Sequence, residues 1–453
     1  MGKLFGTDGI RGEANLYPMD GETAYSVGQA VTRLLKKKGH KVQIVIGKDT
    51  RISGDMLEDS LVAGISSMGG DSCPVGVLPT PGIAFITVDL HASAGIVISA
   101  SHNPYQDNGI KIFSGDGFKL SDEQEELIEN FILKGNLPQI ASPANEMGHA
   151  TRIDDLFNRY ISFLKESFPH DLTMEGIKIV IDTANGATYK TAPALFTSLG
   201  ADVAIIHNSP DGKNINDNCG SQFTQDLQEH VRQSGASIGL AFDGDGDRLI
   251  AVDEKGSEIT GDQIMLICAK ALKKQGRLKN NLLVTSVMSN LGLSVACKKQ
   301  GINRHESKVG DRYVLEDMQR LGAVIGGEES GHIILLDHHT TSDGVITSLQ
   351  LIAAMIREQK TLSQLAAMMD VYPQRLINVE VRNKPEISSV PPLMEAIKDV
   401  ETQLGDQGRV LVRYSGTQNL CRVMVEGPTD DMTEKYCTRI ANEVEIALGL
   451  SQE

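Results

Sequence analysis

The segment Asp-Gly-Asp-Gly-Asp-Arg at residues 243–248 places three carboxylates at alternate positions, separated by glycines. Carboxylate oxygens are the ligands that hard cations such as Mg²⁺ and Ca²⁺ prefer, and three neighbouring carboxylates repel one another unless a cation joins them. The segment is not an EF-hand, because Arg248 stands where that loop requires glycine and the flanking residues have the pattern of strands. We therefore predict that Asp243, Asp245 and Asp247 bind a metal ion, with an acidic surface turn as the alternative.

A second polar loop, Ser99-Ala-Ser-His-Asn-Pro104, follows an apolar segment and contains a candidate nucleophile, Ser101. A serine nucleophile needs an adjacent base, or a metal that can hold it as a phosphoserine. The second route is open if this loop meets the aspartate loop. Lys111 comes after Asn108-Gly109, a dipeptide typical of hairpin turns, so we predict that the chain turns there and returns with Lys111 on the next strand. A structural His102 and a solvent-facing Lys111 are the alternatives.

Two segments near the ends of the chain have the composition of anion sites. The later one joins hydroxyls, an open glycine backbone and two guanidiniums, a set that suits a phosphate monoester, although an ordinary Ser-Gly turn is the alternative. Its residues are Arg413, Ser415, Gly416, Thr417 and Arg422. The earlier one, Gly6-Thr-Asp-Gly-Ile-Arg-Gly12, is a glycine-rich loop that carries Arg11. It lacks the preceding strand and the Gly-Lys-Ser/Thr ending of a nucleotide-binding loop.

One supersecondary pattern occurs three times along the chain: strand, polar turn, helix, glycine and strand, followed by an apolar strand, a polar loop and a return strand. Strands that alternate with helices of this length predict parallel pairing and α/β domains. The polar loops 99–104, 243–248 and 327–332 would lie at equivalent positions and could converge on one cleft. Prolines break the pattern after residue 369, and the tail reads β-α-β-loop-β-α. The predicted fold has three similar α/β domains with mixed sheets (residues 1–152, 153–253 and 254–368) plus a smaller C-terminal α+β domain (369–453).

The 453 residues include 43 Lys and Arg against 59 Asp and Glu, a net charge of −16. This balance argues against nucleic acid or an anionic membrane as a partner, while a local basic pocket could still bind a small anion. No apolar run approaches the roughly 20 residues of a membrane span, and the opening residues lack the charged-then-apolar pattern of a secretion signal. Six scattered cysteines without a Cys-x-x-Cys pair are typical of reduced, buried thiols. The sequence therefore predicts a cytoplasmic protein.

Taken together, these motifs resemble the α-D-phosphohexomutase superfamily over the whole chain. In that family four domains surround a central cleft, the first three share one fold, and a phosphoserine transfers its phosphoryl group to a sugar phosphate. The resemblance implies that Ser101 is this serine, and that it binds one Mg²⁺ together with Asp243, Asp245 and Asp247. Residues that match the surroundings of the transferred phosphoryl group are Arg11, Lys111 (a candidate general acid or base), Arg248 and His332.

His102, next to Ser101, is a further catalytic candidate. Glu328 and Ser330 match residues that read the sugar hydroxyls. The distal phosphate site is matched by Arg413, Ser415, Gly416, Thr417 and Arg422. Here the family usually reads Ser-Gly-Thr-Glu-Pro, whereas this chain reads Ser-Gly-Thr-Gln-Asn and thus departs at Gln418 and Asn419.

Within the superfamily, residues 3–12, 99–111 and 308–313 are most similar to the branch that acts on amino sugars. That likeness implies interconversion of glucosamine 6-phosphate and glucosamine 1-phosphate through glucosamine 1,6-bisphosphate, in the supply of amino-sugar nucleotide and cell-wall precursors. A phosphoglucomutase or phosphomannomutase is the nearest alternative, and a non-catalytic sugar-phosphate or calcium-binding protein is the other. A small phosphosugar is the expected partner, and a homodimer is compatible with the resemblance.

Overall fold

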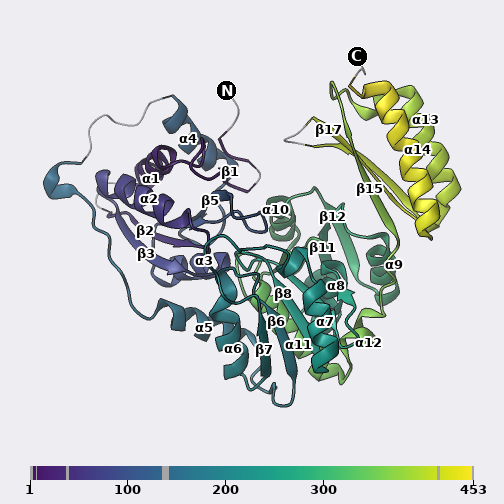
Figure 1. Ribbon diagram of the computed structural model, residues 1–453, viewed down its shortest axis with the longest axis horizontal. Coiled ribbons are helices and arrows are strands. Elements are labelled where there is room, and N and C mark those ends of the chain that lie inside the picture. Colours follow the sequence, from purple (N-terminus) through teal and green to yellow (C-terminus); the bar gives the residue numbers. More distant parts are fainter. Residues whose placement is uncertain (1–3, 7, 37–39, 135–141, 416–418, 451–453) are drawn as a thin grey trace. The chain divides into compact units, whose positions relative to one another are not determined.

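The computed structural model describes residues 4–6, 8–36, 40–134, 142–415 and 419–450, and it separates into two compact units. The larger unit consists of residues 1–288 and 302–367, and the smaller unit of residues 289–301 and 368–453. Three of the sheets found among the described residues lie in the larger unit and one in the smaller unit (Figure 1).

The first sheet is mixed, with the strand order β1-β5-β4-β2-β3. Strand β2 pairs in parallel with β3 and β4, whereas β5 runs antiparallel to both β4 and β1. The strands are β1 (Ile10–Glu13), β2 (Gln43–Lys48), β3 (Asp71–Val77), β4 (Ala94–Ile98) and β5 (Asp107–Ser114). The accompanying helices are α1 (Gly21–Leu35), α2 (Gly54–Ser67), α3 (Thr80–Asp89) and α4 (Asp122–Leu133).

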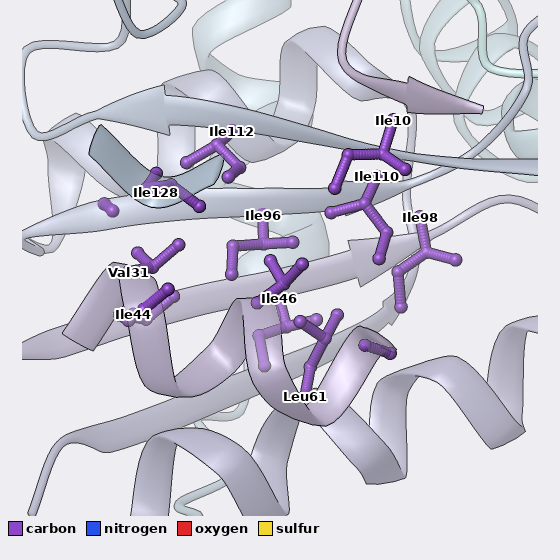
Figure 2. Close-up of a cluster of buried hydrophobic side chains, with 14 of the residues drawn as sticks. Ile10, Val31, Ile44, Ile46, Leu61, Ile96, Ile98, Ile110, Ile112 and Ile128 are labelled. Atoms are coloured by element: carbon purple, nitrogen blue, oxygen red, sulfur yellow. The ribbon is translucent and has the colours of Figure 1, made fainter. Parts of the chain in front are cut away.

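Alternation of side chains along β2 and β4 determines which helices cover each face of this sheet. Ile44 and Ile96 point to one face, where they pack with side chains of α1, α2 and α4 in a buried core (Figure 2). Successive residues of a strand face opposite sides, so Gly47 and Gly95 face α3. A Cβ atom on Gly47 would lie 2.1 Å from Cδ1 of Ile83, so α3 can pack this closely only against glycine. The sheet is thus packed on both faces, and it holds the loop between β4 and β5 on a rigid support.

The second and third sheets repeat this plan. Their strand orders are β10-β9-β8-β6-β7 and β12-β11-β13-β14, with parallel pairing at the centre and an antiparallel strand beside it. The strands of the second sheet are β6 (Lys178–Asp182), β7 (Asp202–Ile206), β8 (Ile238–Phe242), β9 (Leu249–Asp253) and β10 (Glu258–Ile259), and its helices are α5 (Leu156–Ser167), α6 (Thr191–Ser198) and α7 (Gln225–Ser234). The strands of the third sheet are β11 (Leu282–Ser286), β12 (Asn303–Ser307), β13 (Ile325–Gly327) and β14 (Ile333–Leu335), and its helices are α8 (Gly261–Lys274), α10 (Asp311–Leu321), α11 (Gly344–Glu358) and α12 (Leu362–Ala366).

The smaller unit has a different architecture, a three-stranded antiparallel sheet in the order β15-β17-β16. Helices α13 and α14 lie together against this sheet (Figure 1), and their apolar side chains share one buried core with β17. The elements are α9 (Leu291–Gln300), β15 (Gln374–Glu380), α13 (Pro391–Leu404), β16 (Arg409–Tyr414), β17 (Leu420–Glu426) and α14 (Asp430–Leu448).

The predicted fold class is confirmed, with three mixed α/β sheets followed by an antiparallel α+β domain. The hairpin turn predicted at Asn108-Gly109 is wrong, because both residues lie inside β5, where Asn108 pairs with Gly12 and Gly109 with Arg11. The domain boundaries and the central cleft remain predictions.

All six cysteines are buried, as expected. Among the described residues, no helix combines the length and the apolar character needed to cross a membrane.

Candidate active site

Three polar loops occupy equivalent positions in the three α/β sheets, as predicted. Each loop joins a central strand to the antiparallel strand beside it: β4 to β5, β8 to β9, and β13 to β14. The second and third loops touch through a backbone bridge between Arg248 and His332, and the N–H of Leu249 donates to the carbonyl oxygen of Gly331 at 3.1 Å. The first and second loops meet through side chains, at Ser101 and Asp243.

Ser101 contacts the aspartate loop directly. Its Oγ donates a hydrogen bond to Oδ2 of Asp243 at 2.6 Å, and it also lies 3.3 Å from Nδ1 of His102. The side chain is buried, and the backbone has φ +52°, a left-handed conformation that is uncommon for residues other than glycine. Such strain persists only where the surroundings hold it in place. The nucleophile predicted from the sequence therefore lies against the predicted metal site.

Arg51 organises the loop that carries Ser101. Its guanidinium donates to the backbone carbonyl oxygens of Ser101 at 3.1 Å, Asn103 at 2.8 Å and Asp107 at 3.0 Å, and also to that of Pro104. A planar guanidinium carries five donors in fixed directions, so it can satisfy several carbonyls at once. Asp49 accepts from Nε of the same guanidinium at 2.9 Å, which balances its charge inside the protein.

The backbone of the serine loop also contacts two other segments, at Asn216 and at Gly244. Nδ2 of Asn216 donates to the carbonyl oxygens of Ser101 and Asn103, each at 2.9 Å. A Cβ atom on Gly244 would lie 2.5 Å from the carbonyl oxygen of Ser101. Glycine at 244 is therefore required for the two loops to meet at this distance.

Asp243, Asp245 and Asp247 form a compact cluster. One carboxylate oxygen from each lies within 4.8 Å of the others, and all three side chains are buried. Oδ1 of Asp245 and Oδ1 of Asp247 are buried without a hydrogen bond in the part of the chain that is described. Buried acceptors without partners are costly, and three oxygen donors at this spacing suit a hard divalent cation. The predicted acidic triad is therefore confirmed as a group that could hold a metal ion.

The pKa values of two carboxyls in the triad are shifted in opposite directions. Burial and repulsion from Asp247 and Asp245 raise the pKa of Asp243 well above its ordinary value. Burial also favours the neutral form of Asp247, but Lys111 and His332 outweigh it and lower the pKa of Asp247 well below its ordinary value. One carboxyl is thus driven toward its protonated form while another is ionised. A divalent cation would relieve this conflict, because it favours ionisation of all three carboxyls.

Lys111 lies at the centre of this site. Strand β5 directs its Nζ to Oδ2 of Asp245 at 2.9 Å and to Oδ2 of Asp8 at 3.2 Å, and 2 % of its side chain is exposed. Burial opposes the charge, but Asp245, Asp8 and Asp247 outweigh it and raise the pKa of Lys111. The solvent-facing alternative for Lys111 is therefore wrong. Its side chain is a buried ammonium group beside the aspartate cluster.

A chain of ion pairs connects Lys111 to the third sheet. Asp8 pairs with Arg11 and with Lys119, and Lys119 also pairs with Asp311 at the start of α10. Arg11 itself lies 3.5 Å, through Nη1, from the carbonyl oxygen of residue 100. These contacts place the predicted Arg11 next to the serine loop. Through Lys119, they also link Asp8 to Asp311 at the start of α10.

His332 and Arg248 complete the cationic surroundings. Nδ1 of His332 lies 3.6 Å from Oδ2 of Asp247, and Nε of Arg248 lies 3.9 Å from Oδ1 of Asp247. Burial and the guanidiniums of Arg248 and Arg11 lower the pKa of His102 to about 4, so His102 is neutral at physiological pH. The site thus contains charged Lys111, Arg11 and Arg248 around the aspartates, and His102 as an uncharged neighbour of the serine.

Glu328 and Ser330 lie on the third loop, between β13 and β14. Oε1 of Glu328 accepts a hydrogen bond from the N–H of Gly310 at 3.1 Å. Both side chains are partly exposed. Glu328 is also close enough to Arg248 to help raise the pKa of that guanidinium. The structure therefore brings Glu328 to the edge of the site.

The predicted phosphate residues belong to the smaller unit. Arg413 on β16 and Arg422 on β17 are directly opposite each other in the sheet, and the N–H of Ser415 donates to the carbonyl oxygen of Leu420 at 2.9 Å. Like charges directly opposite each other repel across a strand pair, and an anion between them would remove that repulsion. Gly416, Thr417 and Gln418 lie outside the described residues.

Sequence reasoning missed four residues that hold the site together: Asp8, Arg51, Lys119 and Asp311. Asp8 and Asp311 lie within segments that were singled out for their family likeness, so a signal existed for them. Arg51 and Lys119 carry no local signal, since an arginine in a polar turn and a lysine before a helix are ordinary surface residues. Their roles depend on which carbonyls and carboxylates the fold brings to them.

A serine that contacts a buried carboxylate cluster able to hold a metal, with buried cations around it, has the composition of a phosphoryl-transfer site. The chain belongs to the phosphoglucomutase/phosphomannomutase family. Residues 2–138, 158–256 and 260–372 match its alpha/beta/alpha domains I, II and III, and residues 376–443 match its C-terminal domain.

Curated proteins that are similar to this chain over its full length include phosphoglucosamine mutases. That of Syntrophobacter fumaroxidans is 68% identical over 99% of this chain and 100% of its own length, and that of Syntrophus aciditrophicus is 60% identical with the same coverage. Among solved structures, a phosphoglucomutase/phosphomannomutase family protein from Burkholderia thailandensis matches with a TM-score of 0.80 and 22% identity over 99% of both chains. N-acetylphosphoglucosamine mutase from Aspergillus fumigatus, in complex with GlcNAc-6P and magnesium, matches with a TM-score of 0.71 and 17% identity over 98% of this chain and 96% of that one. These structures confirm the fold.

Proposed function

We propose that this chain is a phosphoglucosamine mutase that interconverts glucosamine 6-phosphate and glucosamine 1-phosphate. The hydrogen bond of 2.6 Å between Oγ of Ser101 and Oδ2 of Asp243 carries the proposal, because it joins the candidate nucleophile to a carboxylate cluster that could hold a metal ion. The full-length likeness to curated phosphoglucosamine mutases supports the choice of substrate. A phosphoglucomutase or phosphomannomutase would use the same chemistry on another sugar.

The phosphorylated Ser101 would give its phosphoryl group to the free hydroxyl of the sugar phosphate. The bond from phosphorus to Oγ of Ser101 breaks and a bond from phosphorus to the sugar oxygen forms. Lys111, the candidate acid and base, would give its proton to the departing Oγ and take the proton of the sugar hydroxyl, so that it ends the step as the ammonium group it was at the start. The product of this half-reaction is glucosamine 1,6-bisphosphate. After this sugar turns around, Oγ of Ser101 takes the other phosphoryl group and releases the isomeric monophosphate.

Asp243, Asp245 and Asp247, together with a phosphate oxygen on Ser101, would hold one Mg²⁺. Oδ1 of Asp245 and Oδ1 of Asp247, which are buried without a hydrogen bond among the described residues, support this assignment. When bound, the cation would neutralise charge on the phosphoryl oxygens. Lys111, Arg11 and Arg248 would stabilise the same oxygens from other directions, and such positioning and charge stabilisation are most of what phosphoryl transfer requires from a protein.

The remaining predicted residues would bind the substrate away from the reacting phosphoryl group. Glu328 and Ser330 would accept and donate hydrogen bonds to the sugar hydroxyls, and His332 would contact the phosphoryl oxygens. The distal phosphate would be bound by Arg413, Ser415, Gly416, Thr417 and Arg422. A clamp that binds phosphate at either end of the bisphosphate would let one nucleophile serve both half-reactions. We also propose the four domains at residues 1–152, 153–253, 254–368 and 369–453, and a homodimer in the cytoplasm.

Intact-mass spectrometry of the purified chain tests the phosphoenzyme. We expect partial occupancy by an adduct of about 80 Da, which excess glucosamine 6-phosphate removes and which the Ser101→Ala variant lacks. Ser101→Ala should keep the fold and lose nearly all activity, because loss of a nucleophile costs many orders of magnitude in kcat.

A panel of the 1-phosphates of glucosamine, glucose and mannose tests which sugar phosphate is the substrate. Preference for glucose or mannose would favour the alternative mutase, and retention of more than a few per cent of kcat in Ser101→Ala would overturn the mechanism.

A further inference from the structure

A second group of possible metal ligands lies in the second α/β sheet, apart from the aspartate loop. Asp182 ends β6, His207 follows β7, and Cys219 lies in the loop that comes next. One ligand atom from each residue lies within 4.8 Å of the others. Because β6 and β7 are parallel neighbours, their carboxyl ends meet at one edge of the sheet, and this brings Asp182 and His207 together.

The chemistry of this group differs from that of the aspartate loop. A thiolate, an imidazole and a carboxylate form the ligand set of a borderline metal such as Zn²⁺, whereas Mg²⁺ prefers oxygen ligands alone. One thiolate and one carboxylate would also balance the two charges of such an ion. Full charge balance matters here, because the side chains of Asp182 and Cys219 are completely buried and unbalanced charge is costly there.

Two groups in the cluster lack the hydrogen bonds expected inside a protein. Cys219 is 0% exposed, and within the described part of the chain its thiol makes no hydrogen bond. Nδ1 of His207 lies 3.0 Å from Oδ2 of Asp182, a contact that forms an ion pair only when the imidazole is protonated, and a neutral imidazole leaves this buried nitrogen without a hydrogen bond among the described residues. The ligand atoms of these two residues lie within 4.8 Å of each other, so one metal ion could serve as the partner of both.

The surrounding contacts are those that orient metal ligands. Nε2 of His207 lies 3.3 Å from Oδ2 of Asp226, and a histidine that binds a metal commonly uses its other nitrogen to contact a carboxylate. Asp182 is also oriented, since its two oxygens accept from the N–H groups of Ala184 at 2.8 Å and Gly220 at 2.9 Å. The side chains of His207 and Asp226 are 24% and 62% exposed, so an ion can enter from that side.

We propose that Asp182, His207 and Cys219 bind a thiophilic divalent metal ion of the Zn²⁺ class, at a site separate from the catalytic cation, with Asp226 orienting the histidine. The site would tie the end of β6 to the loop of residues 207–219. That loop continues into the contact with the serine loop, because the N–H of Asn216 donates to the carbonyl oxygen of Ala184 while its side chain binds Ser101.

Cobalt titration of the full chain in excess Mg²⁺ tests the proposal. Co²⁺ bound by a thiolate gives a near-ultraviolet charge-transfer band, which binding to carboxylates alone does not give. We expect one equivalent of this band, its absence in Cys219→Ala, and its retention in Cys268→Ala, a matched control at another buried cysteine. Absence of the band in the intact chain, or its persistence in Cys219→Ala, would overturn the proposal.

Two further variants test the site even if the Cys219→Ala protein does not fold. His207→Asn removes the imidazole but suits the backbone, since His207 has φ +49° and asparagine tolerates this region. We expect it to lower the Co²⁺ affinity at least tenfold. Asp226→Asn changes an exposed residue, and it should keep the band while it lowers the affinity by about 10- to 100-fold, the usual effect of losing an orienting carboxylate. Unchanged affinity in both folded variants contradicts the site.

Discussion

Nη2 of Arg51 donates a hydrogen bond to the carbonyl oxygen of Ser101 at 3.1 Å, and the same guanidinium binds three more carbonyls of the loop that follows. Arg51 thus binds the backbone of Ser101, the proposed nucleophile, whose φ is +52°. We infer that Arg51 is a positioning residue for Ser101.

Arg51→Lys should impair catalysis although the charge is retained. An ammonium group has three donors on a flexible stem and cannot reproduce the planar fork. We expect kcat to fall on the order of 10²-fold, the usual cost of a small misplacement of a reacting group. Steady-state kinetics check this, with Arg357→Lys on the surface of α11 as the control. A variant as active as the control would mean that the loop holds its shape without Arg51.

Asp245→Asn should weaken magnesium binding. The substitution keeps the size of the side chain but removes one negative charge from the triad, and the number of charged ligands sets the affinity of such sites. We expect at least about a tenfold loss of affinity by calorimetric titration, and loss of activity in the unmodified chain after treatment with EDTA. Asp217→Asn, an exposed residue of the same α/β sheet, is the control. Full activity after EDTA would leave the acidic surface turn as the better interpretation.

Glu328→Ala should lower kcat/KM for glucosamine 6-phosphate. A charge-assisted hydrogen bond to a sugar hydroxyl is worth about 1.5–3 kcal/mol, so the loss should be between about 10- and 150-fold. Glu328→Gln keeps an acceptor oxygen and should lose less. The two variants are compared across the hexose phosphate panel. An unchanged kcat/KM in both would show that the third loop does not reach the sugar.

Arg422→Ala should raise KM strongly, because a guanidinium contact to the distal phosphate has no local replacement. The loop departs from the family pattern at Gln418 and Asn419, yet none of the proposed donors is altered there. Restoring the usual pair, Gln418→Glu with Asn419→Pro, should therefore change KM by less than about tenfold, or 1.4 kcal/mol. Arg439→Ala on α14 is the surface control. Activity that appears only in the double variant would mean that this loop is inactive in the natural chain.

His339 should make the folded state sensitive to acid. Nδ1 accepts from the N–H of Thr340 at 2.8 Å, so Nε2 carries the hydrogen, and it donates to the carbonyl oxygen of Pro81 at 2.9 Å. Burial lowers the pKa of His339 to about 4, below the ordinary value of 6.5. The unfolded chain therefore takes up this proton first, and the free energy of unfolding falls as the pH drops from 6.5 toward 4.

The loss from His339 alone could reach about 3 kcal/mol. Urea unfolding of the chain and of His339→Gln, each at pH 7 and pH 4.5, measures it. We expect a smaller difference between the two pH values in the variant, and no such reduction in His170→Gln, whose side chain is 79% exposed. Equal differences in all three proteins would mean that His339 does not titrate on unfolding.

Much of the site could be predicted because its chemistry is concentrated in short segments. The aspartates at 243, 245 and 247 and the serine at 101 lie in loops next to apolar strands, and the repeated pattern of elements places those loops at equivalent positions. The hairpin turn predicted at Asn108-Gly109 is wrong because this dipeptide is typical of turns, whereas pairing with β1 keeps it in an extended strand. Arg51 and Lys119 could not be found, since their partners are backbone carbonyls and carboxylates that only the tertiary fold brings to them.

The contacts that build the active site join residues that are far apart along the chain. Ser101 and Asp243 are separated by 142 positions, and Lys119 and Asp311 by 192. Bringing the ends of such long loops together costs conformational entropy of the chain before the contacts can stabilise it. We therefore expect long-range pairs to form late in folding. Ser101 and Asp243 belong to the first and second α/β sheets, so we expect their contact to form only after these two sheets have docked. Catalytic competence is therefore among the last properties that the chain acquires as it folds.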